Sequence, residues 1–302
     1  MDTSKPMRVR WDVDFRGRTG RTKRIARQIH EASPRVVELW IEGEKGLSEL
    51  PAIYTEIHKC NPRVVATVSL FPGAASVTQR GYSMDFIWEV DARGPFRGLL
   101  PHGAEAISVT IDEDSLAHFP DVLEEFAGSD VRELHLPNVN AVRALAEVGH
   151  VPLPQPGKLQ EAAEIASRLP VSLVGKRLVI HDFFLWKHLQ AAFPGEAGER
   201  AEFSECRAAS ALAYVDWEGN VYPCESLPIR LGNLQERTFE KIWRSPARLQ
   251  ILETVRAVPD ACGPRDQAPG CLYVCRGLLR DVPGSPDAAQ TPRTERPATG
   301  RS

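Results

Sequence analysis

The chain has no long hydrophobic run and no strong charge of either sign. No stretch of about eighteen apolar residues occurs anywhere in its 302 residues, which argues against a membrane span. The opening segment, MDTSKPMRVRWDVDF, contains no apolar stretch of signal-peptide length. A formal net charge of −3 provides no broad basic surface for nucleic acid. We therefore expect a soluble cytoplasmic protein that neither spans a membrane nor binds nucleic acid.

Cysteine is also scarce, but its distribution is uneven. Only six cysteines occur, and one of them, Cys60, stands alone in a predicted helix. Clustered thiols in a chain without a secretory signal favour metal or iron–sulfur ligation over disulfides. An iron–sulfur cluster, a structural zinc site and buried cysteines that merely pack are the three interpretations, and the lack of CxxC pairs argues against zinc. The candidate metal ligands are Cys206, Cys224, Cys262, Cys271 and Cys275.

Residues 1–198 alternate between predicted strands and predicted helices. Such alternation indicates βαβ units and a parallel sheet, and about six units predict a partial, open barrel. The expected strands are 8–15, 36–43, 63–71, 83–90, 105–112, 132–139 and 176–184, and the expected helices are 25–32, 47–60, 116–128, 141–149 and 158–170. The basic segment 16–24 reads as a loop, either simply solvated or able to bind a phosphate or an acidic peptide.

The rest of the chain predicts a small cysteine-rich domain at 199–281, after a polar segment, 194–203. Residues 209–224 read as a hairpin, with Gly219 free to adopt a positive φ in the turn. That hairpin brings Cys206 and Cys224 together at its open end, and one helix is expected at 238–257. Residues 282–302 are rich in Pro, Thr and Ser and are expected to be disordered.

The phrase GNVYPCESLPIRLGNLQERTFEKIW and its flanking cysteines resemble the SPASM domain found in many radical-SAM peptide-modifying enzymes. Cys206, Gly219 and Cys224 match the first half of the family pattern. In the second half, CxxCx5CxxxC, Arg265 replaces one cysteine, and no cysteine follows Cys275.

The resemblance implies one [4Fe-4S] cluster. It assigns Cys206, Cys224 and Cys275 to the first family cluster and leaves Cys262 and Cys271 as two ligands of an incomplete second one. Two thiolates are too few for a normal cluster. The fourth iron of the expected cluster would take a non-cysteine ligand, a substrate atom, or one of the two remaining cysteines.

The N-terminal part resembles the radical-SAM barrel with its cluster motif lost. WDVDFR at 11–16 is similar to the phrase that precedes CxxxCxxC in that family, but Gly17, Arg21 and Arg24 stand at the three cysteine positions. Arginine stays cationic and cannot act as a thiolate. The resemblance therefore implies a degenerate barrel that we do not expect to bind S-adenosylmethionine.

The pair Gly43-Glu44 in IEGEKGL looks like a remnant of the family's S-adenosylmethionine-binding GGE motif. The whole combination resembles the SPASM-domain protein of the GeoRSP system. That resemblance implies an accessory protein that works with an intact radical-SAM/SPASM enzyme and a PqqD-like peptide-binding protein on a ribosomally made peptide. It also implies that the chain is not an autonomous radical-SAM enzyme. The alternatives are an independent non-radical enzyme and a structural zinc-binding protein.

Overall fold

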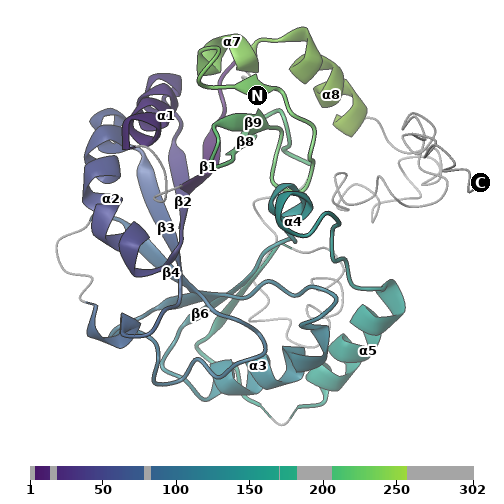
Figure 1. The fold of residues 1–302 in the computed structure, drawn as a ribbon. Helices are drawn as coiled ribbons and strands as arrows, with labels where there is room; N and C mark the ends of the chain where they lie inside the picture. Colours follow the sequence, from purple (N-terminus) through teal and green to yellow (C-terminus); the bar gives the residue numbers. More distant parts are fainter. Residues whose placement is uncertain (1–3, 14–18, 78–82, 170, 182–205, 257–302) are drawn as a thin grey trace, which may run out of the picture.

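A computed structural model describes residues 4–13, 19–77, 83–169, 171–181 and 206–256. In this part of the chain ten strands form one sheet in the order β10-β9-β8-β1-β2-β3-β4-β5-β6-β7 (Figure 1). The strands are β1 (Arg8–Val13), β2 (Val36–Ile41), β3 (Arg63–Ser69), β4 (Asp85–Glu89), β5 (Ala106–Ser108), β6 (Glu133–Leu136), β7 (Arg177–Ile180), β8 (Leu212–Val215), β9 (Asn220–Tyr222) and β10 (Gly232–Asn233). The helices are α1 (Thr19–Ala32), α2 (Gly43–Ile57), α3 (Phe119–Ala127), α4 (Ala141–Glu147), α5 (Pro156–Ser167), α7 (Phe239–Trp243) and α8 (Pro246–Arg256).

Strands β1 to β7 are parallel to one another throughout. Figure 1 shows the sheet curving, with α1 and α2 beside one part of its outer side and α3 and α5 beside another. Strands β10 and β7 are the two ends of the sheet order, so the described sheet does not close on itself. The α/β fold with an open parallel barrel, predicted from the sequence, is confirmed.

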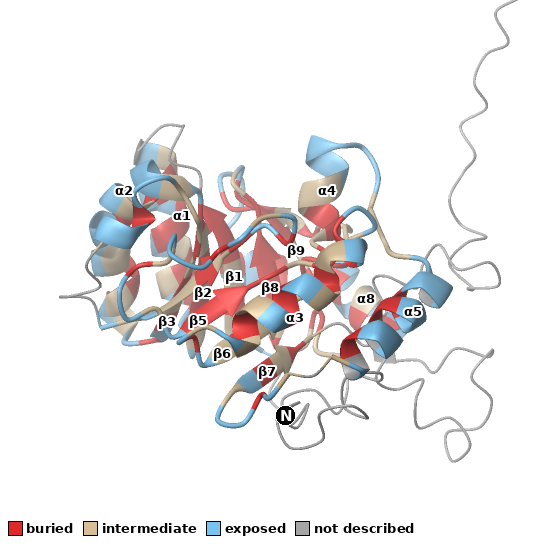
Figure 2. Cartoon of the chain, turned by 90° about the horizontal axis from the view of Figure 1, so that it is seen from below, coloured by how far each residue is buried: buried red, intermediate tan, exposed pale blue. Residues whose placement is uncertain are grey.

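The outer side of the sheet holds the main hydrophobic core. On β1, Val9, Trp11 and Val13 are all buried, and α1 packs Ile25 and Ile29 into the same core. Figure 2 shows buried positions along the strands and exposed positions on the outward sides of α1 and α2. Each large apolar side chain buried in this way contributes about 1.5–3 kcal/mol. None of the described helices is both long and apolar enough to cross a bilayer.

The cysteine-bearing hairpin continues the same sheet. Strands β8 and β9 are antiparallel, and β8 also pairs in parallel with β1, from Arg8 opposite Leu212 to Trp11 opposite Val215. The sheet therefore runs without a break from the barrel into the C-terminal part. The predicted boundary at 194–203 and the predicted disordered tail at 282–302 lie outside the described residues.

Two helices begin earlier than the sequence predicts. Helix α1 starts at Thr19, so most of the predicted basic loop is helical; Thr22 and Ile25 are already buried, in the spacing of one helix face. Helix α2 starts at Gly43 rather than at residue 47. Gly43 has φ of +60°, which glycine adopts without steric cost, and the chain passes from β2 into the helix within two residues.

The long helix predicted at 238–257 is wrong, because two helices, α7 and α8, occupy that segment. Pro246 disfavours a helical conformation at Ser245, and the Ser245 hydroxyl accepts a hydrogen bond from the Arg248 backbone N–H at 3.3 Å. Ser245 thus caps α8 after α7 has ended. The strand predicted at 105–112 is also shorter than expected, since β5 ends at Ser108.

Candidate functional site: the inner face of the barrel and the cysteine hairpin

The inner side of the sheet encloses a polar cavity of about 590 Å³. Residues that alternate with the outer core positions line it: Arg8, Arg10 and Asp12 on β1, for example, against the buried Val9, Trp11 and Val13. All seven parallel strands contribute to the lining, together with the segment before α4 and Glu225 of the hairpin region. We call this space the inner-face cavity.

A charged network lies near the carboxyl ends of the strands, where β/α barrels place their chemistry. Asp12 is 1% exposed and accepts from Arg143 Nε at 3.0 Å and from a second Arg143 nitrogen at 2.8 Å. The Tyr214 hydroxyl donates to the same Asp12 oxygen at 2.5 Å. Arg143 also stacks on the Trp40 ring, 3.7 Å from its centroid, and the Trp40 indole donates to Glu89 at 2.6 Å.

A second network is centred on Arg10, the cavity-lining residue that precedes Asp12 on the same side of β1. Arg10 donates to Glu38 at 2.7 Å and is also paired with Glu225. Burial opposes ionisation of Glu38, yet the charges of Arg10 and Arg8 lower its pKa to about 2. Burial, followed by the Arg10 charge, lowers the pKa of His181 to about 3. At neutral pH Glu38 is therefore a carboxylate and His181 a neutral imidazole.

The segment around the start of α4 connects the barrel to the hairpin region. The Asn140 side chain caps α4 by accepting from the Arg143 N–H at 3.0 Å and donates to the Tyr214 hydroxyl at 3.2 Å. The Val142 N–H donates to the Glu225 carbonyl at 3.1 Å. Figure 1 shows α4 between β6 and the β8–β9 hairpin. The cavity wall is thus built jointly by barrel and hairpin.

The hairpin turn forms as the sequence predicts. Gly219 has φ of +85°, and a Cβ there would approach Ile25 of α1 to 3.2 Å, so glycine suits both the turn and the packing. Asp216 accepts from the Glu218 and Asn220 backbone N–H groups at 2.9 and 2.8 Å. Asn220 in turn accepts from Asn233 Nδ2 at 2.8 Å, which ties the turn to β10.

Two candidate ligands lie at the open end of this hairpin. Cys224 is buried and Cys206 half-buried, and both pack in one small apolar cluster with Leu252 and Val255 of α8. Arg248 of α8 donates to the Ala209 carbonyl at 2.6 Å, which fixes the helix against the hairpin base. The hairpin base thus places both cysteines against the same apolar cluster, and their joint ligation of a metal stays a prediction.

The remaining cysteine candidates fall elsewhere. Cys262, Cys271 and Cys275 lie outside the described residues. Within the residues that the structure describes, no group of three or more potential ligands is arranged for a metal ion. Cys60 lies in a short 3-10 turn, and its thiol donates to the Ile57 carbonyl at 3.3 Å. This turn precedes β3, which is separated from the hairpin strand β8 by β1 and β2 in the sheet.

Four of the five positions compared above with radical-SAM motifs lie in the described part of the chain. Arg24 donates to the Gln235 carbonyl at 2.9 Å, and Arg21 is half-buried on α1, whereas Gly17 lies outside the described residues. Gly43 donates its N–H to Ser69 Oγ at 2.9 Å. Glu44 is exposed at the start of α2, and neither residue of the pair lines the inner-face cavity.

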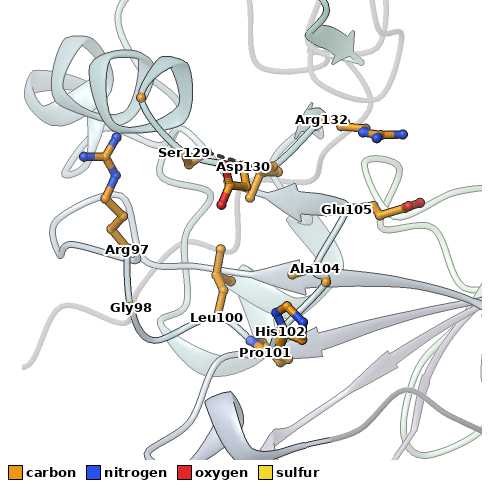
Figure 3. A pocket seen from close by; sticks show the side chains of 13 residues that line it. Arg97, Gly98, Leu100, Pro101, His102, Ala104, Glu105, Ser129, Asp130 and Arg132 are labelled. Atoms are coloured by element: carbon orange, nitrogen blue, oxygen red, sulfur yellow. Dashed lines mark hydrogen bonds between the residues drawn. The ribbon is translucent and has the colours of Figure 1, made fainter.

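A second cavity of about 660 Å³ lies before strands β5 and β6, at the opposite end of the sheet from the Asp12 network. Figure 3 shows Arg97, His102 and Asp130 among its lining residues. All three are exposed, and the described lining contains no buried side-chain atom without a partner. Its surface is therefore less organised for a ligand than the inner face.

Comparisons with known proteins agree with this architecture. The SPASM family pattern, described as an iron-sulfur cluster-binding domain, matches residues 206–271. This chain carries a SPASM domain. The match covers the hairpin, α7 and α8, and the SPASM domain thereby includes Glu225, which lines the inner-face cavity, and Tyr214, which donates to the lining residue Asp12.

Solved structures of anSMEcpe, a radical-SAM/SPASM enzyme, share the fold of both the barrel and the SPASM domain. A histidine-tagged form of anSMEcpe with bound AdoMet aligns over 90% of this chain and 89% of its own, with TM-score 0.57 and 13% identity. Native anSMEcpe with bound AdoMet and Cp18Cys peptide aligns over 89% of each chain, with TM-score 0.56 and 13% identity. No curated protein matches the chain.

Sequence reasoning missed the residues that join the barrel to the SPASM domain. Asp12, Arg143, Tyr214 and Glu225 are distant along the chain, and local patterns do not show that β8 lies beside β1. One signal was available: the strand RVRWDV alternates charged with apolar residues, which is unusual for the interior of a closed barrel filled with branched side chains.

Proposed function

We propose that this chain is an accessory iron–sulfur protein that acts, in the cytoplasm, with a separate radical-SAM enzyme on a ribosomally made peptide. The observation that carries the proposal is the pairing of a polar inner-face cavity with a cysteine-bearing SPASM hairpin, while Arg21 and Arg24 stand where radical chemistry requires thiolates. The barrel provides a place to hold the peptide, and the partner enzyme supplies the radical. A PqqD-like protein would deliver the peptide.

The chemistry around Cys206 and Cys224 fits half of a four-thiolate [4Fe-4S] site. Both thiols lie in an apolar cluster closed by Leu252 and Val255, an environment that shields a cluster from solvent. Cys275 is the third proposed ligand, and Cys262 or Cys271 is a candidate fourth. When bound, such a cluster would supply electron transfer or an open iron for a substrate atom.

The contact made by Arg24 supports the absence of a radical centre in this chain. Its guanidinium is used to hold the SPASM backbone at Gln235, and Gln28 of the same helix accepts from the Phe239 N–H at 3.1 Å. Helix α1 thus connects the barrel to the SPASM domain through these two hydrogen bonds. A cationic side chain at this position also disfavours iron, since arginine has no lone pair to donate.

Peptide binding is supported by the size and wall of the inner-face cavity. Its volume of about 590 Å³ lies within the usual range for ligand sites. The related fold of anSMEcpe is solved with AdoMet and with peptide, and we propose that the peptide role is the one retained here. S-adenosylmethionine is not expected to be cleaved by this chain.

Co-expression with the candidate radical-SAM partner and its peptide tests the accessory role. We expect co-purification, faster peptide modification with this chain present, and no 5′-deoxyadenosine from this chain with dithionite and S-adenosylmethionine. Full modification without the chain, or 5′-deoxyadenosine formed by the purified chain, would favour an independent enzyme.

Iron content of anaerobically purified protein tests the cluster. Cys206→Ala and Cys224→Ala are each expected to remove most of the iron, because loss of one of few thiolates opens the cluster. Cys60→Ala is the matched control and should retain iron, since Cys60 lies in a separate 3-10 turn. Zinc in place of iron, or equal iron loss from Cys60→Ala, would contradict the assignment.

A further inference from the structure

Three buried acceptor oxygens on the wall of the inner-face cavity have no hydrogen-bond partner within the described part of the chain. They are Asp12 Oδ1, Asn138 Oδ1 and Glu225 Oε2, and all three residues line the cavity. Asp12 and Glu225 are 1% and 7% exposed. An acceptor buried without a partner destabilises a protein appreciably, so three in one cavity require an explanation. We call these three oxygens the acceptor corner.

The acceptor corner is held together by contacts that cross from barrel to SPASM domain. Asp12 accepts from Tyr214, whose hydroxyl also accepts from Asn140 in the loop that carries the third acceptor. The Glu225 carbonyl accepts from the Val142 N–H, at the start of the following helix. The segment from Asn138 to Val142 therefore contacts both Tyr214 and Glu225 of the SPASM domain.

The charges around the acceptor corner favour a cation. The other oxygen of Asp12 is already paired with Arg143, and the other oxygen of Glu225 with Arg10. Across the whole described lining, seven carboxylates face six guanidinium groups. Burial of a charge is costly unless it is paired, so the remaining negative charge is best matched by one positive charge on the ligand.

The number and type of acceptors identify the cation. Two carboxylate oxygens and one amide oxygen would also suit a hard divalent cation, but the lining has only one carboxylate more than it has guanidinium groups, which a single positive charge offsets. An ammonium group has three N–H donors, one for each oxygen of the acceptor corner. Its single positive charge offsets the one excess carboxylate. We propose that the acceptor corner binds a primary ammonium group of the peptide, either a lysine side chain or the amino terminus. This inference rests on the proposed peptide-binding function and names the group that is recognised.

The test uses the full chain, purified anaerobically with its iron, and isothermal titration calorimetry with defined probes. The lysine probe is acetyl-Gly-Lys-Gly-amide, and its matched control carries acetylated lysine, which has lost the charge and two of its donors. Gly-Ala-Gly-amide, with a free amino terminus, distinguishes the second source of the ammonium. AdoMet, which also carries an ammonium group, is the fourth probe.

We expect one of the two amine peptides to bind at least about tenfold more tightly than the acetylated peptide, because a site whose acceptors are matched to the N–H donors of its ligand discriminates strongly against loss of those donors. Glu225→Gln and Asp12→Asn should each weaken that binding about tenfold, and Asn138→Ala about threefold. Asp121→Asn is the control, since Asp121 is an exposed carboxylate on α3 that lies outside the cavity lining.

Because Asp12→Asn also alters a buried ion pair, its unfolding transition is recorded first. If that variant does not fold, the uncharged change Asn138→Ala and the acetylation comparison in the wild-type chain decide the result. Equal affinity for the amine and acetylated peptides, or no binding of either, would overturn the ammonium assignment. Tighter binding of AdoMet than of both amine peptides would overturn the choice of a peptide. These outcomes leave the iron content and the partner co-purification unchanged, so the proposed function is judged separately.

Discussion

The two faces of the parallel sheet are built by the same strands and yet differ in the forces that stabilise them. On β1, Val9 and Trp11 are 0% and 1% exposed against the helices, while Arg10 and Asp12, their neighbours in sequence, line the inner-face cavity. The outer face is stabilised by apolar burial, at roughly 25 cal/mol for each square ångström removed from water. The inner face instead carries charged side chains that pair with one another, such as Arg10 with Glu38 and Arg143 with Asp12.

This difference separates folding from function within one sheet. Closed β/α barrels fill their interior with branched apolar side chains and use it as a second core. Here the interior is charged and open, and a buried ion pair is weak evidence for stability because desolvation offsets most of its attraction. The outer face therefore accounts for folding, and the inner face is free to recognise a ligand.

Breaking one side of an inner-face ion pair gives the largest expected loss of stability. Arg143→Met leaves the Asp12 carboxylate buried without its cation, which should lower the free energy of unfolding by about 3–5 kcal/mol. Urea denaturation followed by circular dichroism measures it. The double change Asp12→Asn with Arg143→Met should recover most of the loss, because it removes both charges. A double variant as unstable as Arg143→Met alone would show that the unpaired charge of Asp12 is not the cause of the loss.

A void created by a substitution in the outer-face core gives the next largest loss of stability. Ile41 on β2 is 0% exposed, and Ile41→Ala should lower the free energy of unfolding by about 3 kcal/mol through lost burial and the void that remains. Thr67→Ala, on the cavity side of the neighbouring strand, is the matched control and should change stability by about 0.5 kcal/mol or less. Equal losses from the two changes, measured by the same urea titrations, would remove the distinction between the faces.

Much of the outer face could be predicted from sequence because its signal is local. The alternation in 8–15, 36–43 and 63–71 predicts the strands β1, β2 and β3, since side chains in a strand point to opposite sides. The hairpin turn at Gly219 was predictable for the same reason, from residues that are adjacent in the chain.

The inner face could not be assembled from sequence because its contacts are long-range. Arg143 reaches Asp12 across 131 positions, and Tyr214 reaches it across 202. Where local prediction was wrong, tertiary burial or a proline decides the outcome: α1 extends back to Thr19, with Thr22 already buried, and Pro246 divides the predicted helix at 238–257.

Acid should weaken the inner face before the outer face. The pKa of His181 is lowered to about 3 by burial and then by the Arg10 charge, with His135 and Arg8 acting in the same direction and Glu38 opposing them. The unfolded chain then binds the proton first, so the stabilisation present above pH 6.5 declines as pH falls toward 3.

Between pH 7 and pH 5 this loss should amount to roughly 1–2 kcal/mol. Urea midpoints at the two pH values measure it, and His181→Gln should reduce the difference between them. An unchanged difference in that variant would assign the pH dependence to other groups.

The smallest expected effect concerns the residue that orients α4 toward the inner face. Asn140 caps α4 and also donates to Tyr214, so Asn140→Ala should lower the free energy of unfolding by about 1 kcal/mol. Thr238→Ala removes a comparable cap from α7, where the Thr238 hydroxyl accepts from the Lys241 N–H at 3.3 Å, and should cost a similar amount.

The two variants should differ in binding, because α4 carries Arg143 into the inner-face cavity whereas α7 lies outside the cavity lining. We expect Asn140→Ala to weaken binding of the preferred amine peptide about threefold and Thr238→Ala to leave it unchanged. Equal effects of both variants on affinity would mean that loss of stability alone, rather than the orientation of α4, controls the inner face.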